Sequence, residues 1–185
     1  MLRLALFALS LLLVALISLT LLPRAEQTVP AATITLLSPS LTLFPQADAD
    51  AVWHFDAESA QYDPNARETV LENITEGERV ENGDVDFTLE ADRVTIDRRD
   101  NLRSDAMYVH LLDSNWYLDM VARADRQVLI DQSRGKFEVP QLTYTGDGIG
   151  ESRDENVRMN FDLTDFEAGG PDTIGYNAFR DDGLD

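Results

Sequence analysis

One short segment of this 185-residue chain alternates like a β-strand and then changes phase in its middle. In FTLEADRVTID, residues 87–97, Phe87, Leu89 and Ala91 alternate with polar residues, as in a strand with one buried face. The next apolar residues are Val94 and Ile96, so the alternation has shifted by one position. Because such a shift sends side chains to the opposite face, we expect a bend or bulge between Ala91 and Val94, with Phe87 and Leu89 facing inward.

The same change of phase recurs along the chain. WHFDAESAQYD, residues 53–63, aligns with residues 87–97 without a gap, and ARADRQVLID, residues 122–131, is a third copy with one extra residue. Residues 137–147 and 159–166 are looser copies, and a small residue, Ala57, Ala91 or Ala124, stands at each of the first three bends. Successive copies begin roughly 30 residues apart, which fits one meandering pair of strands per repeat. We therefore expect an all-β, antiparallel, jellyroll-like fold in which two sheets open around one long apolar crevice.

Turn residues divide the rest of the chain into strands. The strongest turn signal is Asn82-Gly83, which predicts a two-residue type I′ hairpin because both residues tolerate a positive φ. No segment after residue 24 keeps a helical period, so residues 51–170 are assigned to the β-jellyroll domain. Residues 24–50 predict a stalk running into a first edge strand that Pro39 interrupts. Residues 171–185 lack alternation and predict a flexible tail.

The N-terminal segment, residues 1–23, predicts a single transmembrane anchor. The run from Leu4 to Leu22 contains no charged residue, no Gly and no Pro, and as a helix it would reach roughly the ~30 Å of a bilayer core. A cleaved signal peptide is the alternative, but its apolar region is usually about 7–15 residues long. Arg3 on the short side favours an inner-membrane, single-pass protein with its C-terminal domain outside the cytoplasm, in the periplasm.

Composition excludes several classes of function. The net charge is −19, which repels the nucleic-acid backbone. The chain has no Cys, no serine elbow motif, and two histidines, His54 and His110, at polar positions of alternating segments, so we expect no enzyme activity and no cofactor. The acidic residues around Asp147 and Glu151 match no EF-hand spacing, and we expect no metal site there.

The remaining candidates are inward-facing apolar residues of the repeats. In the simplest interpretation they are the core that any β-sandwich needs. The alternative is that they line a crevice for an apolar ligand with flexible chains, because Trp, Phe and Met recur among the inward positions. The candidate lipid-binding residues are Trp53, Phe55, Phe87, Leu89, Val94, Ile96, Trp116, Leu118, Phe137, Val139, Tyr144 and Phe161.

An N-terminal span, a stalk, no cysteine and β repeats over residues 53–166 together resemble the LptC family, the membrane-anchored component of lipopolysaccharide export. The repeated shape, aromatic-x-hydrophobic-x-Ala followed by a shifted apolar pair and Asp, is similar to the OstA-type repeat. The resemblance implies a V-shaped β-jellyroll that accepts acyl chains between its sheets. It also implies an N-terminal edge that docks on the permease subunits of an ABC transporter and a C-terminal edge that docks on a soluble periplasmic bridge protein.

We therefore expect a lipid-conduit subunit of an envelope lipid exporter, with a lipopolysaccharide-like glycolipid as cargo. Two features depart from the family. The charge of −19 is unfavourable for a phosphorylated head group, which must stay outside the crevice unless the cargo is a different envelope lipid. The tail is also longer and more polar than a docking edge needs. The alternatives are a non-catalytic anchored β-sandwich scaffold and a cell-surface interaction module, neither with lipid cargo.

Overall fold

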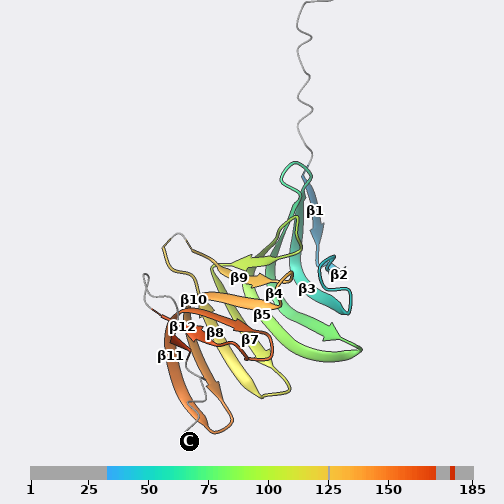
Figure 1. Cartoon of the computed structure of the whole chain (residues 1–185). Helices are drawn as coiled ribbons and strands as arrows, with labels where there is room; N and C mark the ends of the chain where they lie inside the picture. Colours follow the sequence, from blue (N-terminus) through green and yellow to red (C-terminus); the bar gives the residue numbers. More distant parts are fainter. Residues whose placement is uncertain (1–32, 125, 170–175, 178–185) are drawn as a thin grey trace, which may run out of the picture. The chain divides into compact units, whose positions relative to one another are not determined.

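The structure is a computed structural model that describes residues 33–124, 126–169 and 176–177 (Figure 1). Within these residues the chain is all-β, as predicted, and forms thirteen strands and no helix. The strands are β1 (Ile34–Leu37), β2 (Ser40–Leu43), β3 (Ala51–Asp63), β4 (Glu68–Glu81), β5 (Asp84–Ile96), β6 (Leu102–Ser104), β7 (Ala106–Leu111), β8 (Trp116–Val121), β9 (Val128–Asp131), β10 (Lys136–Gly146), β11 (Ile149–Asn160), β12 (Glu167–Ala168) and β13 (Tyr176–Asn177).

Six of the strands close into a ring. The hydrogen-bonded order runs from β5 through β6, β9, β10, β8 and β7 and returns to β5, with every neighbouring pair antiparallel. β5 and β10 are long enough to take part in two layers. The first half of β5 pairs with β7 and its end with β6, while the start of β10 pairs with β9 and its second half with β8. The β6–β9 layer and the β7–β8 layer therefore lie on opposite sides of one interior.

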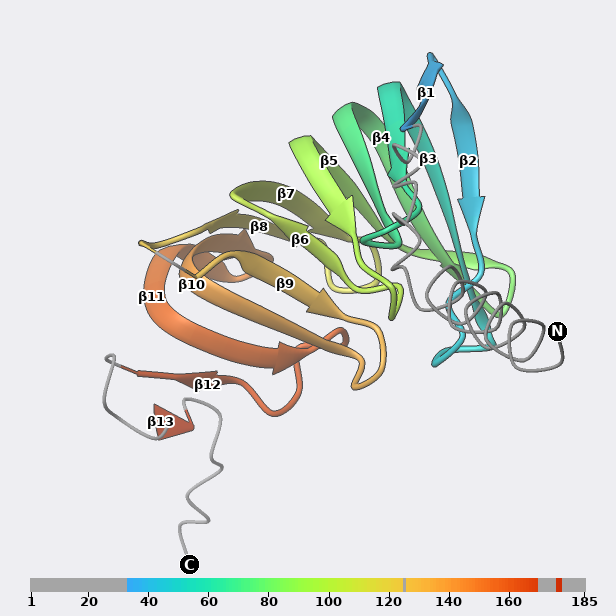
Figure 2. The ribbon, with the colours of Figure 1, turned by 90° about the horizontal axis from the view of Figure 1, so that it is seen from above.

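The other strands extend the ring on both sides. β4 and β3 follow β5, and the outer edge of β3 carries β1 along one half and β2 along the other. On the far side β11, β12 and β13 follow β10. Figure 2 shows this succession from β1 and β2 at one end to β12 and β13 at the other. One cluster of buried apolar side chains, drawn from both layers, fills the inside.

The predicted change of phase in β5 is confirmed. Phe87 and Leu89 are buried, Asp92 and Arg93 are both exposed, and burial resumes at Val94 and Ile96. The prediction of a bulge between Ala91 and Val94 is wrong, because the strand pairs regularly there; the register irregularity lies on the neighbouring β4, between Ile74 and Gly77. β3 repeats the behaviour, with a register shift between Asp56 and Ala57 and a shift in its buried positions before Ala60. Because each strand rotates its buried face at this point, it contributes side chains to both layers of one core.

The third copy behaves differently from the prediction. Its phase change falls in the connection between β8 and β9, outside any long strand, and Ala124 is exposed there with a φ of 54°. Ala124 therefore does not make room for a corner in a strand, as we expected. In this repeat the chain passes from one layer to the other through a loop, so a bent strand is not needed. The fourth copy, β10, does change phase within the strand, next to the buried Pro140.

The hairpin at Asn82-Gly83 forms as predicted. β4 ends at Glu81, β5 begins at Asp84, and Asn82 and Gly83 have φ values of 53° and 95°. A two-residue type I′ turn requires positive φ at both central positions, which Asn and Gly adopt at low cost. This turn joins two of the three longest strands among the described residues.

Residues Ala32–Asp185 form one compact unit that contains the whole buried cluster, so we expect this unit to fold without the preceding residues. The predicted anchor, residues 1–23, and residues 24–32 of the predicted stalk lie outside the described residues. In the part that the structure describes, no helix has the length and apolar character needed to cross a membrane. The predicted tail also lies outside them, except for β13, which pairs with β12.

Candidate functional site

The twelve residues predicted to line a crevice lie together in the interior. Eleven of them are buried, and Tyr144 is partly buried against the same cluster. They come from β3, β5, β8 and β10 and from the residue that follows β11. Sequence periodicity therefore located the inside of the fold. Whether the inside accepts a ligand depends on how these side chains pack.

The aromatic side chains pack closely across the interior. The Trp53 ring stacks on Phe55 with 5.3 Å between centroids and meets Phe87 edge-on at the same separation. Phe87 in turn lies 5.4 Å from Phe137 and 5.5 Å from Phe161, and those two rings are 4.8 Å apart. Such pairs each contribute about 0.5–1.5 kcal/mol beyond the burial of their area. The chain's own side chains therefore occupy the space between the two layers.

A second aromatic group closes the interior beside β11. Trp116 stacks on Tyr144 at 5.4 Å, and Tyr144 lies 5.9 Å from Phe166 in the segment before β12. The Tyr144 hydroxyl donates a hydrogen bond of 3.0 Å to Asp154. Burial, together with this carboxylate, raises the pKa of Tyr144 above its ordinary value, so the phenol stays protonated. This part of the interior is covered on its outer side by the C-terminal strands.

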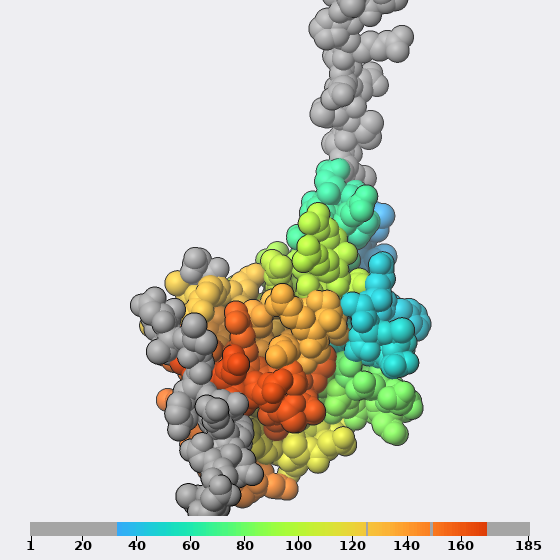
Figure 3. Space-filling view, in the orientation of Figure 1, coloured from blue at the N-terminus to red at the C-terminus, as the bar shows by residue number. Residues whose placement is uncertain are grey.

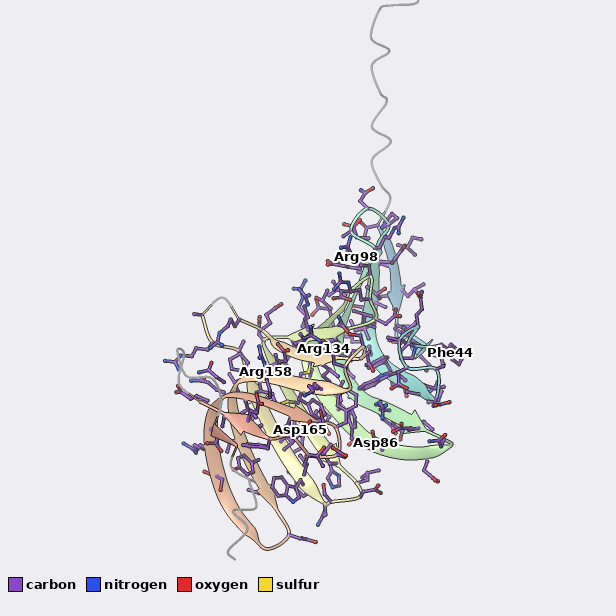
Figure 4. All side chains as sticks on the ribbon, viewed as in Figure 1. Phe44, Asp86, Arg98, Arg134, Arg158 and Asp165 are labelled. Atoms are coloured by element: carbon purple, nitrogen blue, oxygen red, sulfur yellow. The ribbon has the colours of Figure 1, made fainter. Side chains whose placement is uncertain are left out.

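The opposite side of the fold is open. On β1, Ile34 and Leu36 pair with Tyr62 and the buried Ala60, and residues directly opposite each other in a sheet face the same way. Ile34 and Leu36 therefore face the interior side, yet they are 56% and 47% exposed. Phe44, just after β2, is also exposed and stands at the margin of the molecule in Figure 4. The apolar interior thus continues to an uncovered sheet edge at the N-terminal end.

Arg79 on β4 is a buried cation at another boundary of the interior. It occupies an inward position and is 2% exposed. Its guanidinium is hydrogen-bonded to three carboxylates: to Asp48 at 2.6 Å, to Glu81 at 3.0 Å, and to Asp86. Its central carbon lies 4.9 Å from the centre of the Phe161 ring, a cation–π distance. Arg79 therefore joins the loop before β3 to the β4–β5 hairpin, directly over the aromatic core.

Charge in this group is unbalanced, because one guanidinium faces three carboxylates. Burial opposes the charge of Arg79, but the hydrogen bonds of Asp48 and Glu81 outweigh it, so the pKa of Arg79 lies above its usual value. Burial also raises the pKa of Asp86, and the attraction of Arg79 does not offset this increase, because Glu81 and Asp113 repel the same charge. The carboxylates are thus undercompensated by the cation that they share.

A cleft of about 410 Å³ leads from the surface to Arg79. It lies where four segments meet: the loop before β3, the β4–β5 hairpin, the turn between β9 and β10, and the end of β11. Figure 3 shows that surface region, where the red and orange surfaces of the later strands meet the green hairpin and the cyan N-terminal loop. Figure 4 places Asp86 in the same region. The lining residues are Ala47, Asp48, Arg79, Glu81, Asp86, Gln132, Ser133, Gly135, Asn160, Phe161 and Asp162.

Sequence reasoning missed Arg79 and this cleft. The one available signal was the phase of β4, in which Gly77 and Arg79 fall on the same inward face. A charged residue on an inward phase is rare unless it is paired. Its partner Asp48 is 31 positions away, however, and no local pattern connects the two residues.

The residues set aside for catalysis and metal binding lie on the surface. His54 is exposed, and His110 stacks on Tyr117 at 4.1 Å on the outer face of β7 and β8. Asp147 accepts a hydrogen bond from Asn115. Among the described residues, no three His, Asp or Glu side chains are grouped closely enough to hold a metal ion.

No family model matches the chain, and no curated protein sequence matches it. A function has to be argued from the interior, its open edge and the cleft at Arg79.

Proposed function

We propose that this chain is a membrane-anchored, non-catalytic conduit for an envelope lipid, built as the V-shaped, repeat-based β-jellyroll of LptC-like proteins. The observation that carries the proposal is the apolar interior. It forms one cluster between two layers and reaches the exposed, inward-facing Ile34 and Leu36 on β1. A closed globular core has no need of an uncovered apolar end.

Acyl chains would bind by replacing the side-chain contacts between the layers. Each CH₂ group moved out of water contributes about 0.8 kcal/mol. Because the interior is filled, the layers must separate to admit a chain, and this separation costs part of that gain. Insertion begins at the β1 edge, where inward side chains already lie exposed. Transfer to the next module exchanges one apolar environment for another, so the direction of transport is set by ATP hydrolysis in a different subunit.

The proposed partners follow from the two ends of the sheet. Among the described residues, β1 and β2 pair with β3 alone, so their outer edge presents backbone groups and exposed apolar side chains that suit strand addition by the permease subunits of an ABC transporter. The C-terminal edge, beyond β11, would meet a soluble periplasmic bridge protein. Residues 1–23 would hold the chain in the inner membrane, with the β domain in the periplasm and a lipopolysaccharide-like glycolipid as cargo.

A second candidate is an anchored scaffold that carries no lipid. The tight packing of Trp53, Phe55, Phe87, Phe137 and Phe161 favours it, since these rings already fill the space that a cargo would need. The two candidates make opposite predictions about what lies beside Leu89 in the cell.

Photocrosslinking in cells separates the two candidates. A diazirine analogue of leucine is placed in the full chain at Leu36 on the open edge, at Leu89 in the interior, or at Leu112 in the turn after β7 as a matched control. A conduit gives lipid adducts at Leu36 and Leu89 and none at Leu112, as measured by mass spectrometry of the purified protein. A scaffold gives no lipid adduct at Leu89, and that result, together with no co-purifying lipid in an organic extract, would refute the conduit.

A further inference from the structure

The cleft at Arg79 carries a surplus of negative charge. Its lining includes four carboxylates, Asp48, Glu81, Asp86 and Asp162, against the single guanidinium of Arg79, which leaves three negative charges. The hydroxyl of Thr164 donates a hydrogen bond to Asp162 at 2.6 Å, and this bond lowers the pKa of Asp162, so it remains ionised. The cleft therefore attracts a cation and repels an anion.

Nearby cations do not remove this surplus. The two terminal nitrogens of Arg79 donate hydrogen bonds to Asp48, Glu81 and Asp86, which all line the cleft. Arg134, in the turn between β9 and β10, pairs with Asp131 and Glu138, which are outside the cleft lining. Lys136 pairs with Asp165, also outside it. Among the described residues that line the cleft, Arg79 is the only cation; its terminal nitrogens are paired with carboxylates, and its Nε is buried and has no partner.

An independent sign of a ligand comes from Gln132. This residue lines the cleft and is only 2% exposed, yet neither its amide nitrogen nor its amide oxygen has a hydrogen-bond partner among the described residues. A buried polar group without a partner costs about 1–3 kcal/mol. The side-chain amide oxygen is an acceptor of the kind that an ammonium group, with three donors and no acceptor, requires, whereas the side-chain nitrogen is a donor that an ammonium group does not satisfy.

The base of the cleft connects with the apolar interior through Phe161. This ring lines the cleft and also packs against Phe87 and Phe137 in the core. The Arg79 guanidinium already lies over this ring, 4.9 Å from its centre, so the ring quadrupole contributes to the attraction of cations here but does not offer this face to a second one. A molecule with an ammonium group at one end and a hydrocarbon chain at the other would fit both environments.

We infer that this cleft binds the ammonium head group of an amine-bearing lipid, with Asp162, Glu81 and Gln132 as the determinants of head-group specificity. The inference rests on the proposed lipid function and specifies its cargo. It distinguishes the cargo from a lipid recognised through phosphate, which the charge surplus disfavours. The carboxylates and the Gln132 amide accept hydrogen bonds from the ammonium group, and the acyl chain lies among the core side chains.

Three probes with the same C12 chain test the inference: dodecylamine, dodecyl phosphate and dodecyl maltoside, each below its critical micelle concentration. Binding to residues 32–185 is measured at pH 7 by titration calorimetry and by tryptophan fluorescence, to which Trp53, against Phe87 in the core, and Trp116 both contribute. We expect the amine to bind at least tenfold more tightly than the phosphate, equivalent to about 1.4 kcal/mol. The preference should fall as ionic strength rises.

Two charge variants test whether the preference for the amine depends on the cleft carboxylates. Asp162→Asn removes one cleft carboxylate that does not pair with Arg79, and it should reduce the preference for the amine severalfold without changing the affinity for dodecyl maltoside. Asp119→Asn, an exposed position on the outer face of β8, changes the net charge equally and should leave the preference unchanged.

The other outcomes contradict either the head-group assignment alone or the lipid function as well. Equal affinity for all three probes leaves the lipid function standing and overturns the assignment of the head group. Tighter binding of the phosphate overturns that assignment as well. If none of the probes binds, both the conduit and the amine assignment are wrong.

Discussion

Replacing Arg79 with Met tests whether the buried cation holds its carboxylates in place. Met keeps the unbranched chain and much of the volume, but it removes the charge and all five N–H donors. Asp48, Glu81 and Asp86 would then face one another with no cation between them. Removing one partner from a buried ionic group is destabilising because the remaining charges stay in a poorly solvated place.

The expected loss in the free energy of unfolding is about 3 kcal/mol, at the low end of the 3–5 kcal/mol typical of a broken buried pair. The low end applies because the side chains of Asp48, Glu81 and Asp86 keep 20%, 44% and 23% of their exposure. For a domain of this size, such a loss lowers the melting temperature by roughly 6–12 °C.

The pH dependence has a defined sign. The pKa of Asp86 is already raised in the folded state by burial, so folding favours its protonated form. Its contribution to stability is present below the unfolded-state pKa and is lost as pH rises through the folded-state pKa. Without Arg79 the folded-state pKa of Asp86 rises further, so the variant should regain stability relative to wild type as the pH falls from 7 to 5.

Urea denaturation of residues 32–185, followed by tryptophan fluorescence at pH 5 and pH 7, measures both effects. Arg93→Met is the matched control, because Arg93 is exposed and its closest approach to Glu72 is 3.6 Å. It should change stability by at most about 0.5 kcal/mol and show the same pH dependence as wild type. If Arg79→Met loses less than about 1 kcal/mol, or if its pH profile parallels that of the control, Arg79 does not organise this cluster.

Two further predictions concern packing and protonation. Gly146→Ala should destabilise the domain by about 1–3 kcal/mol in thermal unfolding, because a Cβ would lie 2.3 Å from Trp116 Cδ1, whereas Gly150→Ala, in open space, should not. Destabilisation by both variants would point to the hairpin backbone instead. Thr164→Val should raise the pKa of Asp162 in a carboxyl NMR titration, because the lowered value depends chiefly on that hydroxyl. In wild type, the stability contributed by the lowered pKa of Asp162 is present above the ordinary Asp pKa and is lost as the pH falls through the lowered pKa. An unchanged titration in the variant would contradict the contact.

Local sequence patterns predicted the interior of this protein because burial has the same period as the strand. Alternation identified Phe87 and Leu89 as inward residues, and its change of phase located the rotation at Asp92 and Arg93. The Asn82-Gly83 turn could be predicted because it requires positive φ values at both central residues, which Asn and Gly tolerate.

Long-range features could not be read in this way. The pairing of β5 with both β6 and β7, which closes the ring, joins segments whose order in space no local pattern encodes. The filled interior depends on the volumes of side chains from four strands, and alternation gives no measure of volume. Arg79 was missed for a similar reason: its inward phase was visible, but one of the carboxylates that stabilise it, Asp48, is 31 positions away in the sequence.

The change of face within β3 and β5 has a consequence for how the chain avoids misfolding. In a uniformly alternating strand, sliding by two residues restores every side chain to its original face, so such an error is penalised weakly. Here a two-residue slide would move the bulge between Ile74 and Gly77 away from the rotation at Asp92 and turn one of the two core faces toward solvent. The irregularity therefore favours a single register, because it destabilises the shifted pairings that a regular sheet of this length would tolerate.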